Sequence, residues 1–162
     1  MTMTVAAELV AALRARGWTL GVAESLTGGA VASEIVSVPG ASEVLLGGIV
    51  SYASEVKHTL LGVDAQLLEA AGAVHPNVAA QMADGVRRAV AVGDRPADVG
   101  IGTTGIAGPD SPDGQPVGTV HIGVVTPTAH AVRSFVFPGS RGEIREQARD
   151  AAILAVLEAV RE

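Results

Sequence analysis

The sequence predicts an α/β fold: a single three-layer α/β/α domain over residues 1–162 with a mixed central sheet. Helical and strand patterns alternate along roughly the first two-thirds of the chain. The later strands follow one another directly, which is typical of a sheet that combines parallel and antiparallel pairs. Hydrophobic residues make up 48% of the 162 residues, enough to build one core.

The first 40 residues predict a helix, a strand and a second helix. Apolar residues spaced along one helical face predict the first helix, which ends near Gly17: Val5, Leu9, Ala12 and Leu13. The segment 18–23, "WTLGVA", is then a short buried strand. The pattern of 28–38, "GGAVASEIVSV", is helical, and Pro39-Gly40 stops it.

The middle of the chain continues the alternation. Residues 47–53, "GGIVSYA", predict a second strand, and 54–63, "SEVKHTLLGV", a short helix capped by Ser54. A longer helix is expected over 76–92. The third strand is expected over 97–105, "ADVGIGTTG".

Consecutive strands follow. Residues 106–116, "IAGPDSPDGQP", contain three prolines and must form a loop. Strands are expected over 117–125 and 131–138, separated by a short connection. The last helix is expected over 141–161.

Composition excludes several classes of function. The net charge is −6 and the ten arginines are scattered, so we expect no nucleic-acid partner. The chain has no cysteine, which excludes thiolate zinc sites and cysteine nucleophiles. Its histidines lack metal-ligand spacing, so we expect no metal and no cofactor: His58, His75, His121 and His130.

We expect a cytoplasmic protein without a membrane partner. Residues 1–18 could be mistaken for a targeting segment, but Glu8 interrupts the apolar run and Arg14 and Arg16 follow it. This segment therefore predicts an amphipathic helix. No uninterrupted run approaches the roughly 20 apolar residues that span a bilayer.

The segment 100–105, "GIGTTG", matches the dinucleotide-binding pattern G-x-G-x-x-G. That pattern binds a pyrophosphate only where a helix begins at its third glycine. The prolines at 109, 112 and 116 exclude such a helix. We therefore expect no Rossmann site, although the loop's N–H groups or a simple turning role for the glycines stay open.

Two scarce residues lie close together. The only lysine, Lys57, follows the only tyrosine, Tyr52, by five positions. A desolvated lysine can lose its proton and act as a base, which arginine cannot do. The alternative is that Tyr52 packs at a strand end and Lys57 is solvated.

Ser25 lies where a strand is expected to turn into a helix. Its hydroxyl could be a nucleophile, with the amides of Leu26, Thr27, Gly28 and Gly29 facing an oxyanion or phosphate. Ser25 could equally cap the helix. Ser54 is a rival nucleophile, because Ser54 to Lys57 spells S-x-x-K, although capping explains Ser54 better.

Five segments share their order and spacing with one known family: "AESLTGG", "GGIVSYASEVKHTLLGV", "GAVHPNVAAQMADGVR", "GIAGPDSPDGQPVGTVHIGV" and "FPGSRGEIREQA". They cover nearly the whole chain and resemble the C-terminal domain of the competence-damage protein CinA, a family with stand-alone nicotinamide-nucleotide amidases. The resemblance implies a three-layer α/β/α domain. It also implies metal-free hydrolysis of nicotinamide mononucleotide to nicotinate mononucleotide and ammonia.

The resemblance assigns roles by position. It implies catalytic roles for Ser25, Tyr52 and Lys57. The residues that it and the local patterns assign to substrate binding are Thr27, Gly28, Gly29, Thr104, Gly105, Ile106, Ala107, Gly108 and Arg141. Arg141 matches an arginine expected near the substrate phosphate. Three positions differ from the family's common residues, with Ser54 for asparagine, His75 for serine and Thr104 for serine.

In the implied mechanism, neutral Lys57 takes the Ser25 proton directly or through Tyr52, and Ser25 attacks the carboxamide carbon. The partners expected are a small nucleotide substrate and further copies of the chain in a homo-oligomer. Two alternatives stay open. The chain could be a nucleotide-binding or regulatory module without turnover, or an amidase or esterase for another small substrate.

Overall fold

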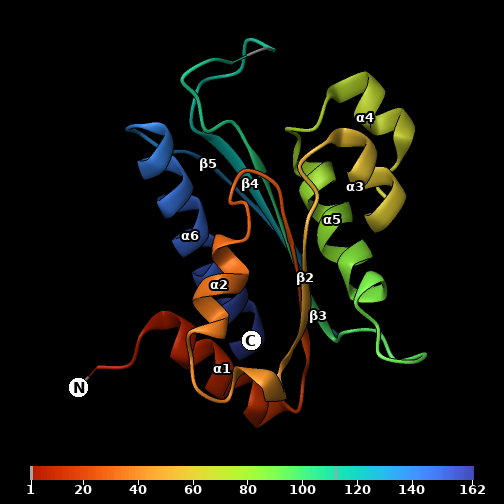
Figure 1. Ribbon diagram of the computed structural model, residues 1–162, viewed down its shortest axis with the longest axis vertical. Helices are drawn as coiled ribbons and strands as arrows, with labels where there is room; N and C mark the ends of the chain where they lie inside the picture. Colours follow the sequence, from red (N-terminus) through yellow and green to blue (C-terminus); the bar gives the residue numbers. More distant parts are fainter. Residues whose placement is uncertain (1, 112) are drawn as a thin grey trace.

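The centre of the molecule is a five-stranded sheet in the order β2-β1-β3-β4-β5 (Figure 1). The computed structural model describes residues 2–111 and 113–162. The strands are β1 (Leu20–Glu24), β2 (Leu45–Val50), β3 (Val99–Gly105), β4 (Thr119–Val125) and β5 (His130–Val136). β1 runs parallel to β2 and β3, while β4 is antiparallel to β3 and β5. The predicted mixed sheet is therefore confirmed.

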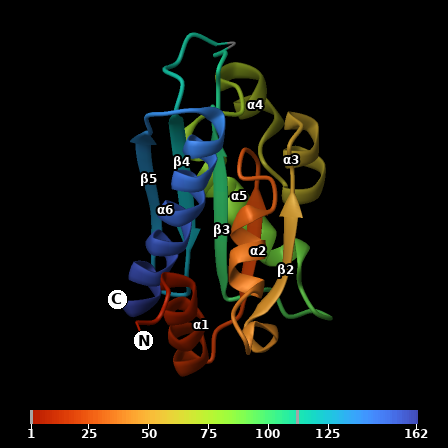
Figure 2. The same cartoon turned by 60° about the vertical axis from the view of Figure 1, so that its left-hand side comes forward.

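Helices cover both faces of this sheet, which confirms the three-layer α/β/α fold. On one face lie α1 (Val5–Arg16), α2 (Ala30–Val36) and α6 (Arg141–Arg161). On the other lie α3 (Ser54–Leu61), α4 (Ala65–Ala71) and α5 (Pro76–Ala89). Figure 1 shows the two helical layers on either side of the strands, and Figure 2 shows α6, α2 and α1 in front of the sheet.

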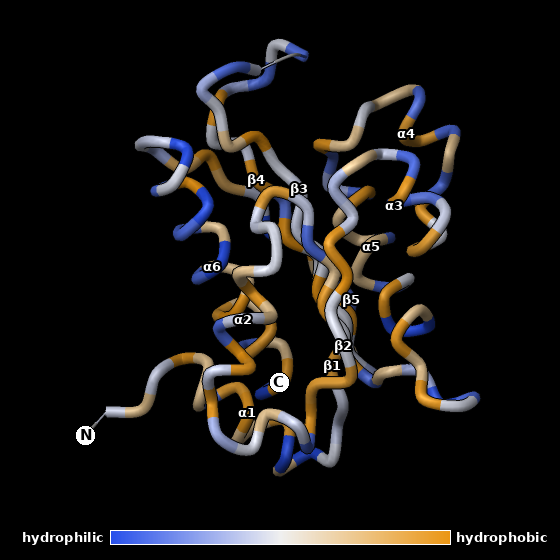
Figure 3. The backbone as a smooth tube through the Cα atoms, viewed as in Figure 1, coloured by the Kyte–Doolittle hydropathy of each residue, from blue (hydrophilic) through white to orange (hydrophobic). Residues whose placement is uncertain are grey.

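Each face of the sheet has its own apolar cluster. The larger cluster joins the sheet to α1, α2 and α6 and includes Leu9, Leu13 and Ile35. The smaller one lies under α3 and α5 and includes Met82 and Val86. Hydrophobic residues are concentrated on the strands and on the inner sides of the helices (Figure 3). Burial of these residues, not local propensity, holds the short helices against the sheet.

The strand face toward α5 is built from glycines. A Cβ atom on Gly100 would lie 1.9 Å from the carbonyl oxygen of Ala83, and one on Gly123 would lie 2.3 Å from that of Ala79. The backbone of α5 therefore approaches the strands too closely for any side chain. This explains "GIGTTG": its first two glycines lie inside β3 against α5, and the next element in the described residues is strand β4 instead of a helix.

Several predictions about the elements were incomplete or wrong. Helix α4 is seven residues long and was not predicted, although Leu67 and Leu68 pack against the smaller apolar cluster and Asp64 caps the helix through a bond from the Gln66 amide. A 3-10 helix, η1 (Ala41–Glu43), was also missed. Helix α2 begins at Ala30 instead of residue 28, because Gly28 and Gly29 adopt left-handed conformations.

Strand β2 begins and ends earlier than predicted, at Leu45 and Val50, and α5 ends at Ala89 instead of residue 92. Within residues 2–111 and 113–162, no helix combines the length and the apolar character that crossing a membrane requires.

The close approach of α5 makes Gly100→Ala a severe change. Neither the β3 backbone nor the α5 backbone can move away cheaply, so we expect the free energy of unfolding to fall by about 3 kcal/mol or more. Gly142→Ala is the control, since a Cβ there meets nothing within 4 Å. It should leave stability unchanged or raise it by up to about 1 kcal/mol. Urea unfolding measures both, and equal stabilities would contradict the close-packing argument.

Candidate active site

The carboxyl ends of the parallel strands bring Ser25 and Lys57 into contact. Ser25 directly follows β1, and Lys57 lies in the first turns of α3, just after β2. The Lys57 ammonium nitrogen, Nζ, is 2.9 Å from Ser25 Oγ. A serine hydroxyl within hydrogen-bond distance of an amine is the arrangement in which the amine can activate the hydroxyl as a nucleophile.

Lys57 is fully buried, which is unusual for a lysine. Besides Ser25, its Nζ donates to the carbonyl oxygens of Ser51 at 2.7 Å and Tyr52 at 3.0 Å. Burial disfavours the charged form and lowers the pKa of Lys57 from 10.5 to about 8. The neutral amine of Lys57 is therefore far more populated near physiological pH than that of an exposed lysine.

The sequence around Lys57 explains its burial. Leu61 lies four residues later on the same helical face and is also buried, so Lys57 occupies a core position of α3. Gly62 then ends the helix in a left-handed conformation, and the Val63 amide donates to the Lys57 carbonyl. Leu61 and Val63 both belong to the smaller apolar cluster.

Ser25 does not cap a helix. The residue that caps α2 is Gly29, and Ser25 instead begins a tight turn in which the Gly28 amide donates to the Ser25 carbonyl at 3.1 Å. The capping interpretation of Ser25 is therefore wrong. Capping by Ser54 is wrong as well, because Ala53 is the N-cap of α3 and makes no side-chain bond, while Ser54 lies exposed in the first turn.

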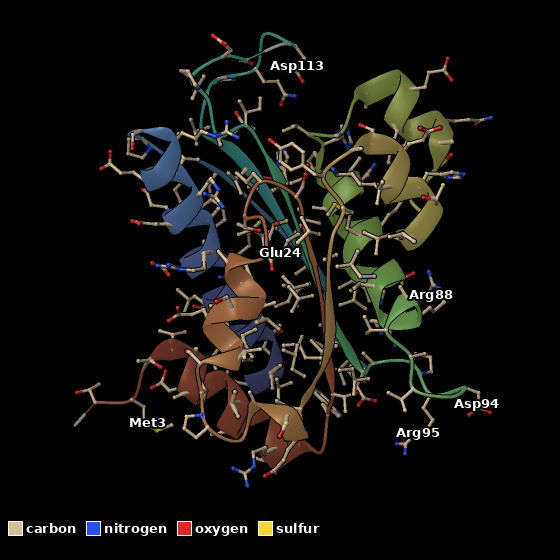
Figure 4. All side chains as sticks on the ribbon, in the orientation of Figure 1. Met3, Glu24, Arg88, Asp94, Arg95 and Asp113 are labelled. Carbon is tan, nitrogen blue, oxygen red and sulfur yellow. The ribbon has the colours of Figure 1, made fainter. Side chains whose placement is uncertain are left out.

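A buried carboxylate that sequence reasoning missed holds the start of α2. The two oxygens of Glu24 accept hydrogen bonds from the Val31 and Ala32 amides at 2.9 and 3.0 Å. Figure 4 shows Glu24 inside the molecule, between α2 and the strands. The signal in the sequence was an acidic residue between an apolar strand and Ser25. The α2 amides that Glu24 holds are not available to a ligand.

The amides before α2 differ in their availability. The Gly28 amide is used within the turn, so the prediction that all four amides from Leu26 to Gly29 are free is wrong for Gly28. In the described part of the chain, the amides of Leu26 and Thr27 have no hydrogen-bond acceptor. They directly follow the nucleophile candidate and are the donors that could stabilise an oxyanion.

A pocket of about 170 Å³ opens at this edge of the sheet. Its walls include seven of the predicted site residues: Ser25, Tyr52, Lys57, Thr104, Gly105, Ala107 and Arg141. Leu26, Ala73 and Val74 complete the lining. The Thr104 hydroxyl is engaged inside the protein, donating to the Ala73 carbonyl at 2.7 Å.

Five of the predicted substrate-binding residues do not line the pocket: Thr27, Gly28, Gly29, Ile106 and Gly108. The Thr27 side chain is fully buried and bonds to Thr103 Oγ1 at 2.8 Å. Ile106 is buried, and the Gly108 carbonyl accepts a bond from Arg141 at 2.6 Å. Any contact of Thr27 with a substrate would therefore come from its backbone.

The Tyr52 hydroxyl is bonded to Arg141 and not to Lys57. Tyr52 is 64% exposed, and its hydroxyl accepts a bond from Arg141 Nη2 at 3.2 Å. Only the Tyr52 carbonyl reaches Lys57. Tyr52 and Arg141 are the exposed residues of the pocket lining. His75, one of the departures from the family pattern, lies outside the lining and caps α5 through Nδ1, which accepts from the Asn77 amide at 3.0 Å.

Arg145 is a second residue that sequence reasoning missed. From α6 its Nε donates to the Leu26 carbonyl at 2.8 Å and its Nη2 to the Thr27 carbonyl at 3.2 Å. Its spacing of four residues from Arg141 places both arginines on one face of a helix, which was the available signal.

Within residues 2–111 and 113–162, no cluster of three or more histidine, aspartate or glutamate side chains could hold a metal ion.

Comparison with known proteins gives a consistent assignment. The model of the CinA C-terminal domain family matches residues 2–160. A CinA-like protein from Frankia casuarinae is 48% identical over 90% of this chain and 32% of its own length. A putative competence-damage inducible protein from Moorella thermoacetica is 44% identical over 93% of this chain and 36% of its own. The chain thus spans about a third of the length of these curated relatives.

Solved structures match along almost their whole length. The competence damage-inducible protein A from Klebsiella pneumoniae has a TM-score of 0.89 at 31% identity, covering 98% of this chain and 96% of its own. A CinA superfamily protein from Escherichia coli has a TM-score of 0.88 at 28% identity, covering 100% and 95%. With these matches to sequence and structure, the chain belongs to the CinA C-terminal domain family.

Proposed function

We propose that this chain is a nicotinamide-nucleotide amidohydrolase that converts nicotinamide mononucleotide to nicotinate mononucleotide and ammonia. The observation that carries the proposal is the 2.9 Å contact between Ser25 Oγ and the buried Lys57 Nζ. The family resemblance adds the substrate class. We also propose that the protein acts in the cytoplasm, as a homo-oligomer and without a metal or cofactor.

Lys57 acts as the general base in its neutral form. A neutral amine has two N–H groups and one lone pair. The Ser51 and Tyr52 carbonyls accept the two N–H groups, so the lone pair is left to accept the Ser25 hydroxyl proton. This arrangement favours direct transfer from Ser25 to Lys57. Transfer through the Tyr52 hydroxyl has less support, because that group lies at Arg141.

The reaction then proceeds in two stages. Ser25 Oγ bonds to the carboxamide carbon while Lys57 takes its proton, and the amides of Leu26 and Thr27 stabilise the oxyanion. Lys57 returns the proton to the amide nitrogen, the C–N bond breaks and ammonia leaves. Water then attacks the ester carbon while Lys57 takes its proton, the bond to Ser25 Oγ breaks, and Lys57 returns the proton to Oγ as the carboxylate leaves.

The pocket fits only part of a nucleotide. Its 170 Å³ is below the range of about 300–1,000 Å³ typical of pockets that enclose a whole ligand. The carboxamide and its ring therefore enter toward Ser25, and the ribose phosphate stays at the mouth. There the Arg141 guanidinium, which now bonds to a backbone carbonyl and a tyrosine, can pair with the phosphate.

Ammonia release from a panel of pyridine compounds tests the proposed substrate. We expect turnover of nicotinamide mononucleotide, unchanged by a chelator, and at least about tenfold lower kcat/KM for nicotinamide riboside, which lacks the phosphate that orients the carbonyl. Simple amides are the comparison. Turnover of simple amides alone would favour a different amidase. Binding of the mononucleotide without any turnover would favour a regulatory module.

Substitutions distinguish Ser25 from Ser54 as the nucleophile. Ser25→Ala should reduce kcat by at least about 1,000-fold while the protein stays folded, because it removes the attacking oxygen. Lys57→Arg should be as severe, since guanidinium keeps its proton. Ser54→Ala is the matched control and should retain most activity. Steady-state kinetics with circular dichroism measures all three, and an inactive Ser54→Ala beside an active Ser25→Ala would reverse the assignment.

The lowered pKa of Lys57 sets the pH dependence. Below about 8 the lysine is increasingly protonated and cannot accept the serine proton. We expect kcat/KM to rise about tenfold per pH unit up to roughly pH 7.5 and to level off above pH 8. A profile from pH 5.5 to 9.5 measures this, and a flat profile below pH 7 would contradict Lys57 as the base.

A further inference from the structure

Arg145 holds the backbone beside the nucleophile candidate, although it lies more than a hundred residues away along the chain. Its guanidinium reaches from α6 to two successive carbonyls, those of Leu26 and Thr27, at 2.8 and 3.2 Å. The fork of a guanidinium presents several N–H groups in a fixed plane and fits paired acceptors of this kind. Arg145 is half-buried, and its two contacts here are both to backbone oxygens.

These two bonds fix the direction of the neighbouring N–H groups. In a trans peptide the C=O and N–H point in opposite directions. Because the Leu26 carbonyl faces Arg145, the Thr27 N–H of the same peptide points away from Arg145. The next N–H, that of Gly28, also points away and closes the turn onto the Ser25 carbonyl. The Thr27 N–H is thus aimed by Arg145 and has no acceptor in residues 2–111 and 113–162.

Gly28 makes room for this arginine. A Cβ atom on Gly28 would lie 3.1 Å from Arg145 Nη2, and the φ of Gly28 is +59°. Gly28 therefore has a role different from the predicted one in substrate binding. Its missing side chain leaves space for the guanidinium, and its left-handed conformation turns the chain toward α2.

The other contacts of this turn hold different groups. Thr103 accepts the Ser25 amide through its carbonyl and bonds to the Thr27 hydroxyl, and Glu24 accepts the α2 amides. In the hydrogen bonds of the described residues, neither Thr103 nor Glu24 bonds to the peptide between Leu26 and Thr27. In the described residues, that peptide carbonyl has Arg145 as its hydrogen-bond donor.

We propose that Arg145 is a positioning residue that orients the Leu26–Thr27 peptide so that the Thr27 N–H stabilises the oxyanion formed on attack by Ser25. The substrate in this inference comes from the proposed amidohydrolase function. The positions of Arg145, Leu26 and Thr27 do not depend on that function. Arg145 itself touches no reacting atom, so its loss should lower the rate of the chemical step and leave substrate binding nearly unchanged.

Two readouts test the proposal. The first is ammonia release from nicotinamide mononucleotide, where Arg145→Ala should lower kcat by about 10- to 100-fold with KM changed less than about threefold. The second is the rate at which a small alkyl fluorophosphonate labels Ser25, followed by intact mass. In that reaction Ser25 Oγ bonds to phosphorus, fluoride leaves and Lys57 takes the proton. The labelling rate should fall by a similar factor.

Three variants or additions separate positioning from folding. Millimolar guanidinium should restore part of both rates in Arg145→Ala, because it can occupy the vacated space. Arg145→Lys should keep the fold and lie between parent and Arg145→Ala, since an ammonium cannot fork between two carbonyls. Arg149→Ala is the matched control on the same helix, where the arginine pairs with exposed Asp150, and it should match the parent.

The outcomes are distinguishable. If the parent turns over the mononucleotide and both Arg145 variants keep the parental kcat and labelling rate, the positioning role is wrong. A loss in Arg145→Ala that guanidinium does not restore and that Arg145→Lys does not share would also overturn it, in favour of a structural role. If the parent releases no ammonia while labelling still depends on Arg145, the proposed substrate fails and the positioning role stands.

Discussion

The burial of one amine beside one hydroxyl is the constraint on which the site depends. Water would keep Lys57 charged and would compete for its hydrogen bonds to Ser51 and Tyr52. Helix α3 therefore has to present a lysine at a core position, and α5 has to cover it. The sheet meets the other requirement, because the parallel β1 and β2 deliver Ser25 and the α3 start to the same edge.

Close packing between α5 and the sheet sets much of the remaining sequence. The glycines of β3 and β4 bring the helix backbone against the strands, while larger residues fill the opposite face around α1, α2 and α6. The pattern "GIGTTG", which resembles a nucleotide-binding motif, is thus explained by the packing of α5 against β3. A glycine pattern indicates close approach of backbone to some neighbour, and only the following element decides whether that neighbour is a phosphate or a helix.

The sequence predicted most of the fold and the pairing of Ser25 with Lys57, but not the contacts that position them. Alternating strands and helices are local patterns, and the scarcity of lysine drew attention to Lys57. Glu24 and Arg145 act on backbone groups, and Arg145 lies 119 residues from Leu26, so no short pattern reports that contact. The same holds for Tyr52. Its position in the chain predicted that it lies near Lys57, but not that its hydroxyl bonds to Arg141. Helix α4 was not predicted because it is short and its residues are at most partly buried.

Apart from Lys57, arginine supplies all the side chains of the Lys/Arg class, and this has a chemical consequence. Acylating reagents and amine-directed cross-linkers react with neutral lysine amines and not with guanidinium groups. Here the single lysine side chain is enclosed at the base of the pocket, so the outer surface offers such reagents no lysine. A reagent small enough to enter, and complementary to the pocket mouth, would find the amine of Lys57 without competition from any other lysine. The composition of the chain and the burial of Lys57 together determine this selectivity among side-chain amines.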